Sequence, residues 1–162
     1  MPEHSSGSHS NTLLIVGGGH ASLPLIKMGK KWAPTLRVVL ISAKPYLYYS
    51  GAIPQFMGGF YDIEETRINL QALAEAYGTE FHQGYVNEIQ PDKKQVRCAD
   101  GSRFSYDALV LNTGVETRAP DDGPGRIIYP VKPMGRLVAL QREREAGTIR
   151  RLLIAGGGAA GV

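Results

Sequence analysis

Residues 12–22 read Thr-Leu-Leu-Ile-Val-Gly-Gly-Gly-His-Ala-Ser, a short apolar run followed directly by three glycines. An apolar run that ends at glycine is typical of a strand buried on both faces, as in a parallel sheet. Residues 20–31 then have a helical pattern, and residues 36–42 (LRVVLIS) form a second apolar run. A strand, a glycine turn, a helix and a strand within about 30 residues predict a βαβ unit with a right-handed crossover.

The glycine turn has the composition of a nucleotide-binding loop. Gly17 suits the tight turn out of the strand, and Gly19 lets the backbone approach a pyrophosphate, which backbone N–H groups at a helix start attract. The third glycine of the G-x-G-x-x-G pattern is replaced by Ser22, a small residue that still permits close packing. A glycine pattern alone also occurs in structural turns, so its place between strand and helix carries the prediction. The residues expected around the pyrophosphate are Gly17, Gly18, Gly19, His20 and Ala21.

The end of the second apolar run lacks the acid that usually holds the adenosine ribose of a dinucleotide. The chain has Ser42, Ala43 and Lys44 at this point. Ser42 can make one hydrogen bond to a ribose hydroxyl, and Lys44 can favour an extra phosphate or lie near the pyrophosphate. Ser42 and Lys44 could equally be ordinary loop residues with no role in cofactor binding. The missing acid favours either a variant mode of cofactor binding or a nucleotide-binding module without catalysis.

The middle of the chain alternates short and long predicted elements. Residues 45–61 are rich in aromatic residues, glycine and proline, which predicts short elements that pack on a large flat partner or on the core. Residues 62–78 are predicted to be helical. Residues 80–112 change to a period of two, which predicts a strand at 81–89, a hairpin turn at Asp100-Gly101 within an antiparallel meander, and then a buried strand at 108–112. A charged helix is predicted for residues 131–147.

A second glycine loop follows the apolar run at residues 151–155 (RLLIA), which predicts a further strand. Its regular G-x-G-x-x-G pattern falls on Gly156, Gly158 and Gly161, about 140 residues after the first loop. Two such loops predict two dinucleotide sites. No helix or strand follows the second loop, so we expect the chain to be the N-terminal fragment of a longer protein.

Composition excludes several classes of function. The net charge of +3 over 162 residues is scattered, without the basic and aromatic patch expected of a nucleic-acid-binding surface. Cys98 is the one cysteine, which excludes an intrachain disulfide and a dithiol relay within these residues. No window approaches the roughly 18 apolar residues of a membrane-spanning helix. No metal site is predicted, since His4 and His9 lie in a polar tail expected to be disordered.

The order of these motifs resembles that of FAD-dependent pyridine-nucleotide oxidoreductases with two dinucleotide-binding domains. Within that group the chain is most similar to type II NADH dehydrogenases, sulfide:quinone reductases and the oxidoreductase domain fused to selenophosphate synthetase. Asn112 stands where alanine is usual, while Thr113 and Gly114 match the turn beside FAD. The stretches that carry the resemblance are GGGHA (17–21), LRVVLIS (36–42), YSGAIP (49–54), the meander and strand (84–114) and LLIAGGGAAGV (152–162).

The resemblance implies an α/β fold: a Rossmann-like FAD-binding domain with a parallel central sheet, helices on both faces and a small antiparallel meander. It implies roles for residues along the FAD, and it identifies no catalytic residue. The pyrophosphate would be held by the first glycine loop, the ribose would lie near Ser42 and Lys44, and the adenine near the backbone of Val86. The isoalloxazine would lie beside Ser50 and Gly51, and Thr113 and Gly114 would line the cleft. The second loop, with Gly156, Gly158 and Gly161, would belong to the NAD(P) site.

The implied function is the FAD-binding portion of an NAD(P)H-dependent oxidoreductase that passes electrons from NAD(P)H through FAD to a quinone or another acceptor. The alternative is a non-catalytic nucleotide-binding or regulatory module with the same fold. The resemblance implies a cytoplasmic protein that meets the membrane peripherally in its full-length form. We expect the fragment alone to turn over little, and its exposed apolar surface to favour a homodimer. The expected organisation is a disordered tail (1–11), the FAD-binding segment (12–118), a linker and helix (119–150), and the start of the NAD(P)-binding domain (151–162).

Overall fold

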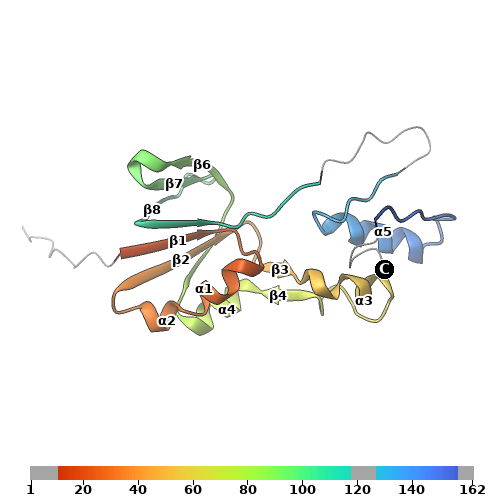
Figure 1. Ribbon diagram of the computed structural model, residues 1–162, viewed down its shortest axis with the longest axis horizontal. Coiled ribbons are helices and arrows are strands. Elements are labelled where there is room, and N and C mark those ends of the chain that lie inside the picture. The colour runs from red at the N-terminus through yellow and green to blue at the C-terminus, as the bar shows by residue number, and fades with distance from the viewer. Residues whose placement is uncertain (1–10, 118–126, 157–162) are drawn as a thin grey trace, which may run out of the picture. The chain divides into compact units, whose positions relative to one another are not determined.

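The computed structural model describes residues 11–117 and 127–156 (Figure 1). The predicted tail therefore lies almost wholly outside the described residues. Contacts divide the chain into two compact units. The first unit contains residues up to 47 and residues 69–113, and the second contains residues 48–68 and those from 114 onward. Each unit is described by itself.

A four-stranded parallel sheet forms the centre of the first unit. Its spatial order is β5-β2-β1-β9, with β1 paired to both β2 and β9. Numbered along the chain, these four strands have the order 3-2-1-4, the arrangement of a dinucleotide-binding half-sheet. The strands are β1 (Asn11–Val16), β2 (Leu36–Ser42), β5 (Glu80–Gln83) and β9 (Ala108–Leu111).

The two faces of this sheet are covered by different layers (Figure 1). Leu13, Ile15 and Leu40 pack on one face against helical residues such as Ile26 and Leu70. Leu14, Val39 and Ile41 pack on the other face against Val96 and Cys98 of the meander. The predicted α/β class with a parallel sheet and a small antiparallel sheet is confirmed. Of the two predicted helical layers, the described residues contain one.

The helical layer is more broken than the sequence predicts. Residues 20–31, expected as one helix, form three short turns. They are η1 (His20–Ser22), α1 (Leu23–Ile26) and α2 (Gly29–Trp32). The buried Thr79 hydroxyl donates to the carbonyl of Ile26 at 2.8 Å, an acceptor that a continuous helix would use internally. This side-chain bond and the close approach of Gly29 to residues 77–79 explain the interruption.

The helix predicted for residues 62–78 is shorter and begins later. Arg67–Asn69 is strand β4, which pairs with β3 (Tyr46–Tyr48), and the helix α4 spans Leu70–Tyr77. The Asn69 side chain accepts a hydrogen bond from the Ala72 amide at 2.9 Å and so fixes the helix start. Gly78 ends the helix in the left-handed conformation (φ 69°), as its position predicts.

The meander comprises three antiparallel strands with the order β6-β7-β8. The strand predicted from Phe81 to Ile89 is in fact two strands in different sheets, because the chain leaves the parallel sheet at Gly84. The Gly84 amide donates to the Ser42 carbonyl at 3.0 Å, and the Tyr85 carbonyl accepts from Ala99 at 2.8 Å in the meander. The elements are β6 (Val86–Gln90), η3 (Pro91–Lys93), β7 (Gln95–Cys98) and β8 (Arg103–Ser105).

The second unit has its own small core of Ile53, Met134, Leu137 and Leu140. Its helical elements are η2 (Ser50–Ala52), α3 (Ile53–Met57) and α5 (Gly135–Glu145). The strand predicted at residues 151–155 is absent: these residues have no regular structure, and Leu153 is 91% exposed. An apolar run becomes a strand only when a neighbouring strand pairs with it, and none does so among the described residues.

The described helices include none that is long and apolar enough to cross a membrane.

An ion pair joins the two strands at one edge of the parallel sheet. Arg37 of β2 holds Glu80 of β5 with both prongs of its guanidinium, with Nε donating to Oε1 at 2.6 Å. This hydrogen-bonded contact lowers the pKa of the Glu80 carboxyl. The side chains are 45% and 55% exposed, so solvent screening limits the stabilisation to about 1 kcal/mol at most.

Glu80→Gln is therefore expected to lower the free energy of unfolding slightly, and only above the acidic range. Because the folded pKa of Glu80 lies below its unfolded value, the stabilisation is present above about pH 4.3 and is lost as the pH falls through the folded pKa. Urea denaturation should show a deficit of about 0.5 kcal/mol at neutral pH that shrinks in acid. A deficit that persists undiminished in acid would contradict this account of the pair.

Candidate functional site

The candidate site lies where three neighbouring parallel strands end. β1 leads into the glycine loop, β2 ends at Ser42, and β9 leads into Asn112. The register pairs Val16 with both Ile41 and Leu111, so the three strand ends are adjacent. In open α/β sheets, ligands bind beyond the carboxyl ends of the strands, at the point where the strand order reverses. In this sheet that point lies between β1 and β9.

The first glycine loop packs so closely that side chains would not fit. Gly17 has a φ of 94°, and a Cβ there would lie 2.2 Å from the Asn112 carbonyl oxygen. A Cβ on Gly18 would lie 2.2 Å from Leu70 Cδ1, and one on Gly19 would lie 2.6 Å from the Asn112 side-chain oxygen. The loop is thus held tightly between β9 and α4. This tight fit brings the loop backbone close to the ends of the strands.

Ser22, which replaces the third glycine of the motif, is fully buried and hydrogen-bonded. Its hydroxyl donates to the Gly17 carbonyl at 2.9 Å and accepts from Asn112 Nδ2 at 2.9 Å. A chain of two hydrogen bonds therefore joins the end of β9 to the first residue of the glycine loop. The two departures from the usual motif, Ser22 and Asn112, are in direct contact. The sequence displays both departures, but only the fold shows that they are partners.

Ser22→Ala and Asn112→Ala are expected to be coupled. Each substitution removes at least one bond of this part-buried chain, and we expect each to lower the free energy of unfolding by about 1–2 kcal/mol. Because both remove the same Asn112–Ser22 bond, the double variant should lose about 0.5–1.5 kcal/mol less than the sum of the two. Chemical denaturation of the four proteins of the cycle measures this. Strict additivity would show that the two side chains do not act together.

The other predicted cofactor residues of the first unit occupy different positions around the strand ends. Ser42 is buried, and its carbonyl accepts from Gly84. Lys44 is exposed, with its ammonium 5.8 Å from the centre of the Tyr46 ring. Val86 is half-buried in the meander, where it packs against the sheet face opposite the helices. Thr113 is exposed and directly follows Asn112.

The remaining predicted residues lie in the second unit or beyond the described residues. Ser50 and Gly51 are exposed in η2, and Gly114 has a φ of 88°. Gly156 also has a positive φ, 111°, but no strand precedes it. Gly158 and Gly161 lie outside the described residues. The structure thus brings the first loop, Ser42 and Thr113 to the carboxyl ends of the parallel strands, whereas Ser50, Gly51, Gly114 and Gly156 belong to the second unit.

The chemistry of this edge suits an anionic dinucleotide. The segments 16–22, 42–44 and 112–113 contain no aspartate or glutamate. They offer backbone amides, the hydroxyls of Ser42 and Thr113, and the ammonium of Lys44. The helical turns after the loop are too short for a macrodipole to contribute much. The hydrogen-bond donors themselves would therefore supply most of the stabilisation of a bound pyrophosphate. The residues present fit a pyrophosphate held by a glycine-lined backbone.

Comparison with known proteins gives consistent matches. The chain is 28% identical to the sulfide-quinone reductase of Aquifex aeolicus over 102 residues, which cover 63% of this chain and 24% of that protein. It is 32% identical to the nitric oxide reductase FlRd-NAD(+) reductase of Escherichia coli, over 94% of this chain and 40% of that protein. The chain thus spans less than half the length of these relatives.

The solved structure of the Aquifex aeolicus sulfide:quinone oxidoreductase shares the fold. The TM-score is 0.74 at 23% sequence identity, over 84% of this chain and 32% of that one. The model of the pyridine nucleotide-disulphide oxidoreductase family matches residues 11–162, nearly the whole chain. That family binds FAD, and NADH-dependent enzymes are among its solved neighbours. The chain therefore belongs to the pyridine nucleotide-disulphide oxidoreductase family.

Proposed function

We propose that this chain binds FAD at its first glycine loop and supplies the FAD-binding portion of an NAD(P)H-dependent oxidoreductase. The observation that carries the proposal is the position of the loop. It follows the first strand of a 3-2-1-4 parallel sheet and meets the end of the fourth, where such sheets bind dinucleotides. The family match over residues 11–162 supports FAD as the dinucleotide.

The proposed roles are those that the family resemblance implies, and the position of the first loop at the strand ends supports those of residues 17–21. Backbone amides of residues 17–21 hold the pyrophosphate, and the Ser42 hydroxyl binds the adenosine ribose in place of the usual acid. Lys44 offsets the phosphate charge, and the backbone of Val86 meets the adenine. Thr113 and Gly114 line the cleft, and Ser50 and Gly51 lie beside the isoalloxazine. Asn112 acts through Ser22 as a positioning residue, because it fixes the loop rather than touching the cofactor.

For the whole protein we propose electron transfer from NAD(P)H through FAD to a quinone or another acceptor. Bound FAD supplies the chemistry, since it accepts a hydride and passes electrons on. This chain offers one cysteine, Cys98, so it has no dithiol to serve as a relay. The named quinone of the Aquifex relative supports a quinone acceptor. The second loop, from Gly156, would begin the NAD(P)-binding part, and residues 12–118 would serve FAD.

Retention of flavin tests the FAD proposal. The purified chain is incubated with excess FAD, desalted, and its visible absorption is recorded. We expect oxidised-flavin bands that remain with the protein, and little NADH oxidation by this chain alone. Addition of NAD⁺ in excess should leave the flavin in place.

Two results would overturn the proposal. A colourless protein that takes up no FAD would remove the cofactor assignment. Tight binding of NAD⁺ with displacement of flavin would reassign the first loop, and would favour the non-catalytic nucleotide-binding module. A separate expectation, that this chain alone oxidises little NADH, would be contradicted by sustained NADH:quinone turnover.

A further inference from the structure

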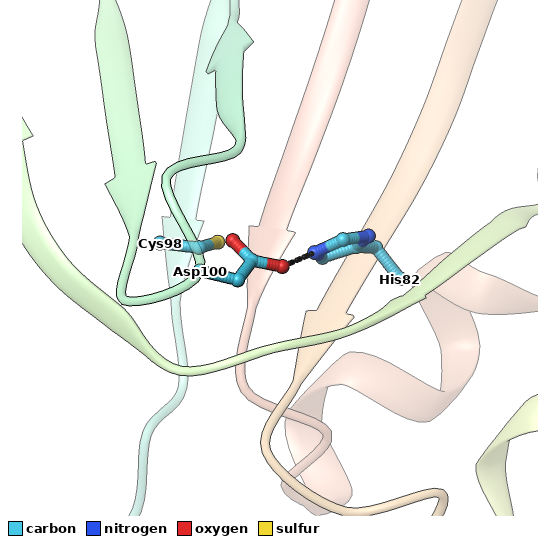
Figure 2. Close-up of side chains that lie close together, drawn as sticks. All are labelled: His82, Cys98 and Asp100. Atoms are coloured by element: carbon cyan, nitrogen blue, oxygen red, sulfur yellow. Dashed lines mark ion pairs between the residues drawn. The ribbon is translucent and has the colours of Figure 1, made fainter.

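A second cluster of chemically active side chains lies away from the glycine loop, between the parallel sheet and the meander. Figure 2 shows His82 pointing toward Asp100, with the Cys98 sulfur on the other side of the carboxylate. His82 belongs to β5, the edge strand of the sheet, and Cys98 ends β7. Asp100 lies in the hairpin turn that follows. All three belong to the first unit.

The donor atoms of the cluster lie somewhat farther apart than the ligands of a bound metal ion. One nitrogen of His82, the Cys98 sulfur and one carboxylate oxygen of Asp100 all lie within 4.8 Å of one another. His82 Nε2 is 3.4 Å from Asp100 Oδ2. Tetrahedral Zn²⁺, with bonds of about 2.0–2.3 Å, places its ligand atoms about 3.3–3.8 Å apart. A small closing movement of the three side chains would therefore complete a coordination sphere.

The surroundings leave the His82 nitrogen free to act as a ligand. Its Nε2 atom is buried and makes no hydrogen bond of standard geometry among the described residues, but faces Asp100 Oδ2 at 3.4 Å. Asp100 is oriented from behind, since its Oδ1 accepts from the Ser102 amide at 2.9 Å and leaves Oδ2 toward His82. This arrangement corresponds to the outer-shell bonds that orient metal ligands. The half-exposed Asp100 side chain gives an ion a route from solvent.

We propose that His82, Cys98 and Asp100 form a binding site for one divalent transition-metal ion of the Zn²⁺ type, with water in the fourth position. The nitrogen, sulfur and oxygen donors match the ligands that Zn²⁺ takes in proteins. A bound ion would link the edge strand β5 to the hairpin after β7. It would therefore fasten the meander to the parallel sheet, at a position away from the glycine loop.

Metal binding at this site should release a proton from Cys98. A cysteine thiol is mostly protonated at neutral pH, since its ordinary pKa is about 8.5. The ion binds the thiolate, and the thiol proton leaves to solvent. We expect the affinity for the ion to rise by about tenfold for each pH unit between pH 7 and 8.

Cobalt(II) is the probe that tests the proposal, because a thiolate–Co²⁺ bond gives a near-ultraviolet charge-transfer band. Cys98 is the chain's one cysteine, so such a band can arise from no other residue. Titration of the full chain with CoCl₂ should give the band with a stoichiometry of one ion per chain. ZnCl₂ should abolish the band by displacement, and should raise the melting temperature as its concentration increases.

Variants separate this site from other histidines. Cys98→Ser should remove the band. His82→Gln and Asp100→Asn should weaken the affinity at least tenfold, the lower end of what loss of an outer-shell partner causes. The control His4→Ala/His9→Ala removes the tail histidines and should change nothing. Asp100→Asn is the safest of these for folding, because the side chain is half-exposed and can still accept from Ser102.

Circular dichroism melts identify any variant that fails to fold, and conclusions then rest on Asp100→Asn. Absence of a charge-transfer band at millimolar Co²⁺ would overturn the proposal. It would also be overturned if folded His82→Gln and Asp100→Asn both bound Co²⁺ as tightly as the original chain. Loss of the band in His4→Ala/His9→Ala would show that the tail histidines bind the ion together with Cys98, and would overturn the three-residue site.

Discussion

Gly17→Ala is expected to abolish FAD binding and to lower the free energy of unfolding by about 3 kcal/mol. Two effects add at this residue. The backbone has a φ of 94°, which strains any residue with a Cβ. The new Cβ would also lie 2.2 Å from the Asn112 carbonyl oxygen, so β9 or the loop must move. Either movement displaces the amides that are proposed to hold the pyrophosphate. Urea denaturation and FAD retention measure the two losses.

Gly101→Ala is the matched control for this prediction. Gly101 has a similar φ, 89°, but a Cβ there meets nothing within 4 Å. The control therefore carries the backbone strain without the clash, and should cost about 1 kcal/mol while FAD binding persists. Equal losses of stability in the two variants would show that close packing of the loop against Asn112 is unimportant. Unchanged FAD binding by folded Gly17→Ala would remove the loop from the site.

Gly29→Ala is expected to destabilise the protein by about 2 kcal/mol, although helix propensity predicts the opposite. Gly29 is the first residue of α2, and alanine normally stabilises a helix over glycine by about 0.5–1 kcal/mol. Here, however, a Cβ would lie 2.5 Å from both Thr79 Oγ1 and the Tyr77 carbonyl oxygen. The clash would also disturb the Thr79 bond to Ile26. The midpoint of chemical denaturation gives the sign directly.

Gly135→Ala gives the contrasting case. Gly135 is also the first residue of its helix, α5, and a Cβ there meets nothing within 4 Å. This substitution should be neutral or stabilising. If Gly29→Ala also stabilised the protein, this would contradict the close contact between α2 and the segment before β5.

The core of the fold could be predicted from the sequence because its signals are local. The runs at 12–16, 36–42 and 108–112 are mostly apolar, and each became a strand of the parallel sheet. The central strands β1 and β2 are largely buried, whereas β9 is an edge strand with Leu111 57% exposed. Gly78 ended its helix as predicted, and the Asp100–Gly101 turn closed a hairpin. Such features depend on a few neighbouring residues, so an apolar run or a glycine is enough to indicate them.

Features that depend on distant partners could not be predicted. The helix break near Gly29 depends on Thr79, which lies 50 residues later. The strand expected from Phe81 to Ile89 divides because Gly84 bonds to Ser42 of another strand. The run at 151–155 has the composition of a strand but pairs with none among the described residues. In each case a tertiary contact, or the lack of one, outweighs the local pattern.

The same distinction holds for the candidate site. The glycine loop is visible in the sequence, whereas the bond between Ser22 and Asn112 joins residues 90 positions apart. The sequence raised no expectation of the cluster of His82, Cys98 and Asp100. His82 lies in the parallel sheet and Cys98 in the meander, so only the packing of the meander on the sheet brings them together. Lone residues of these types are usually structural, and it is their convergence between the sheet and the meander that supports the proposed metal site.

Backbone amide chemical shifts test the central claim most directly, because they show where FAD binds as well as whether it binds. The ¹⁵N-labelled chain is titrated with FAD and followed by ¹H–¹⁵N correlation spectra. We predict that the largest perturbations fall on Gly18, Gly19, His20 and Ala21, with smaller ones at Ser42 and Thr113. Saturable perturbations confined to other residues, or none at all, would contradict the assignment of FAD to the first glycine loop.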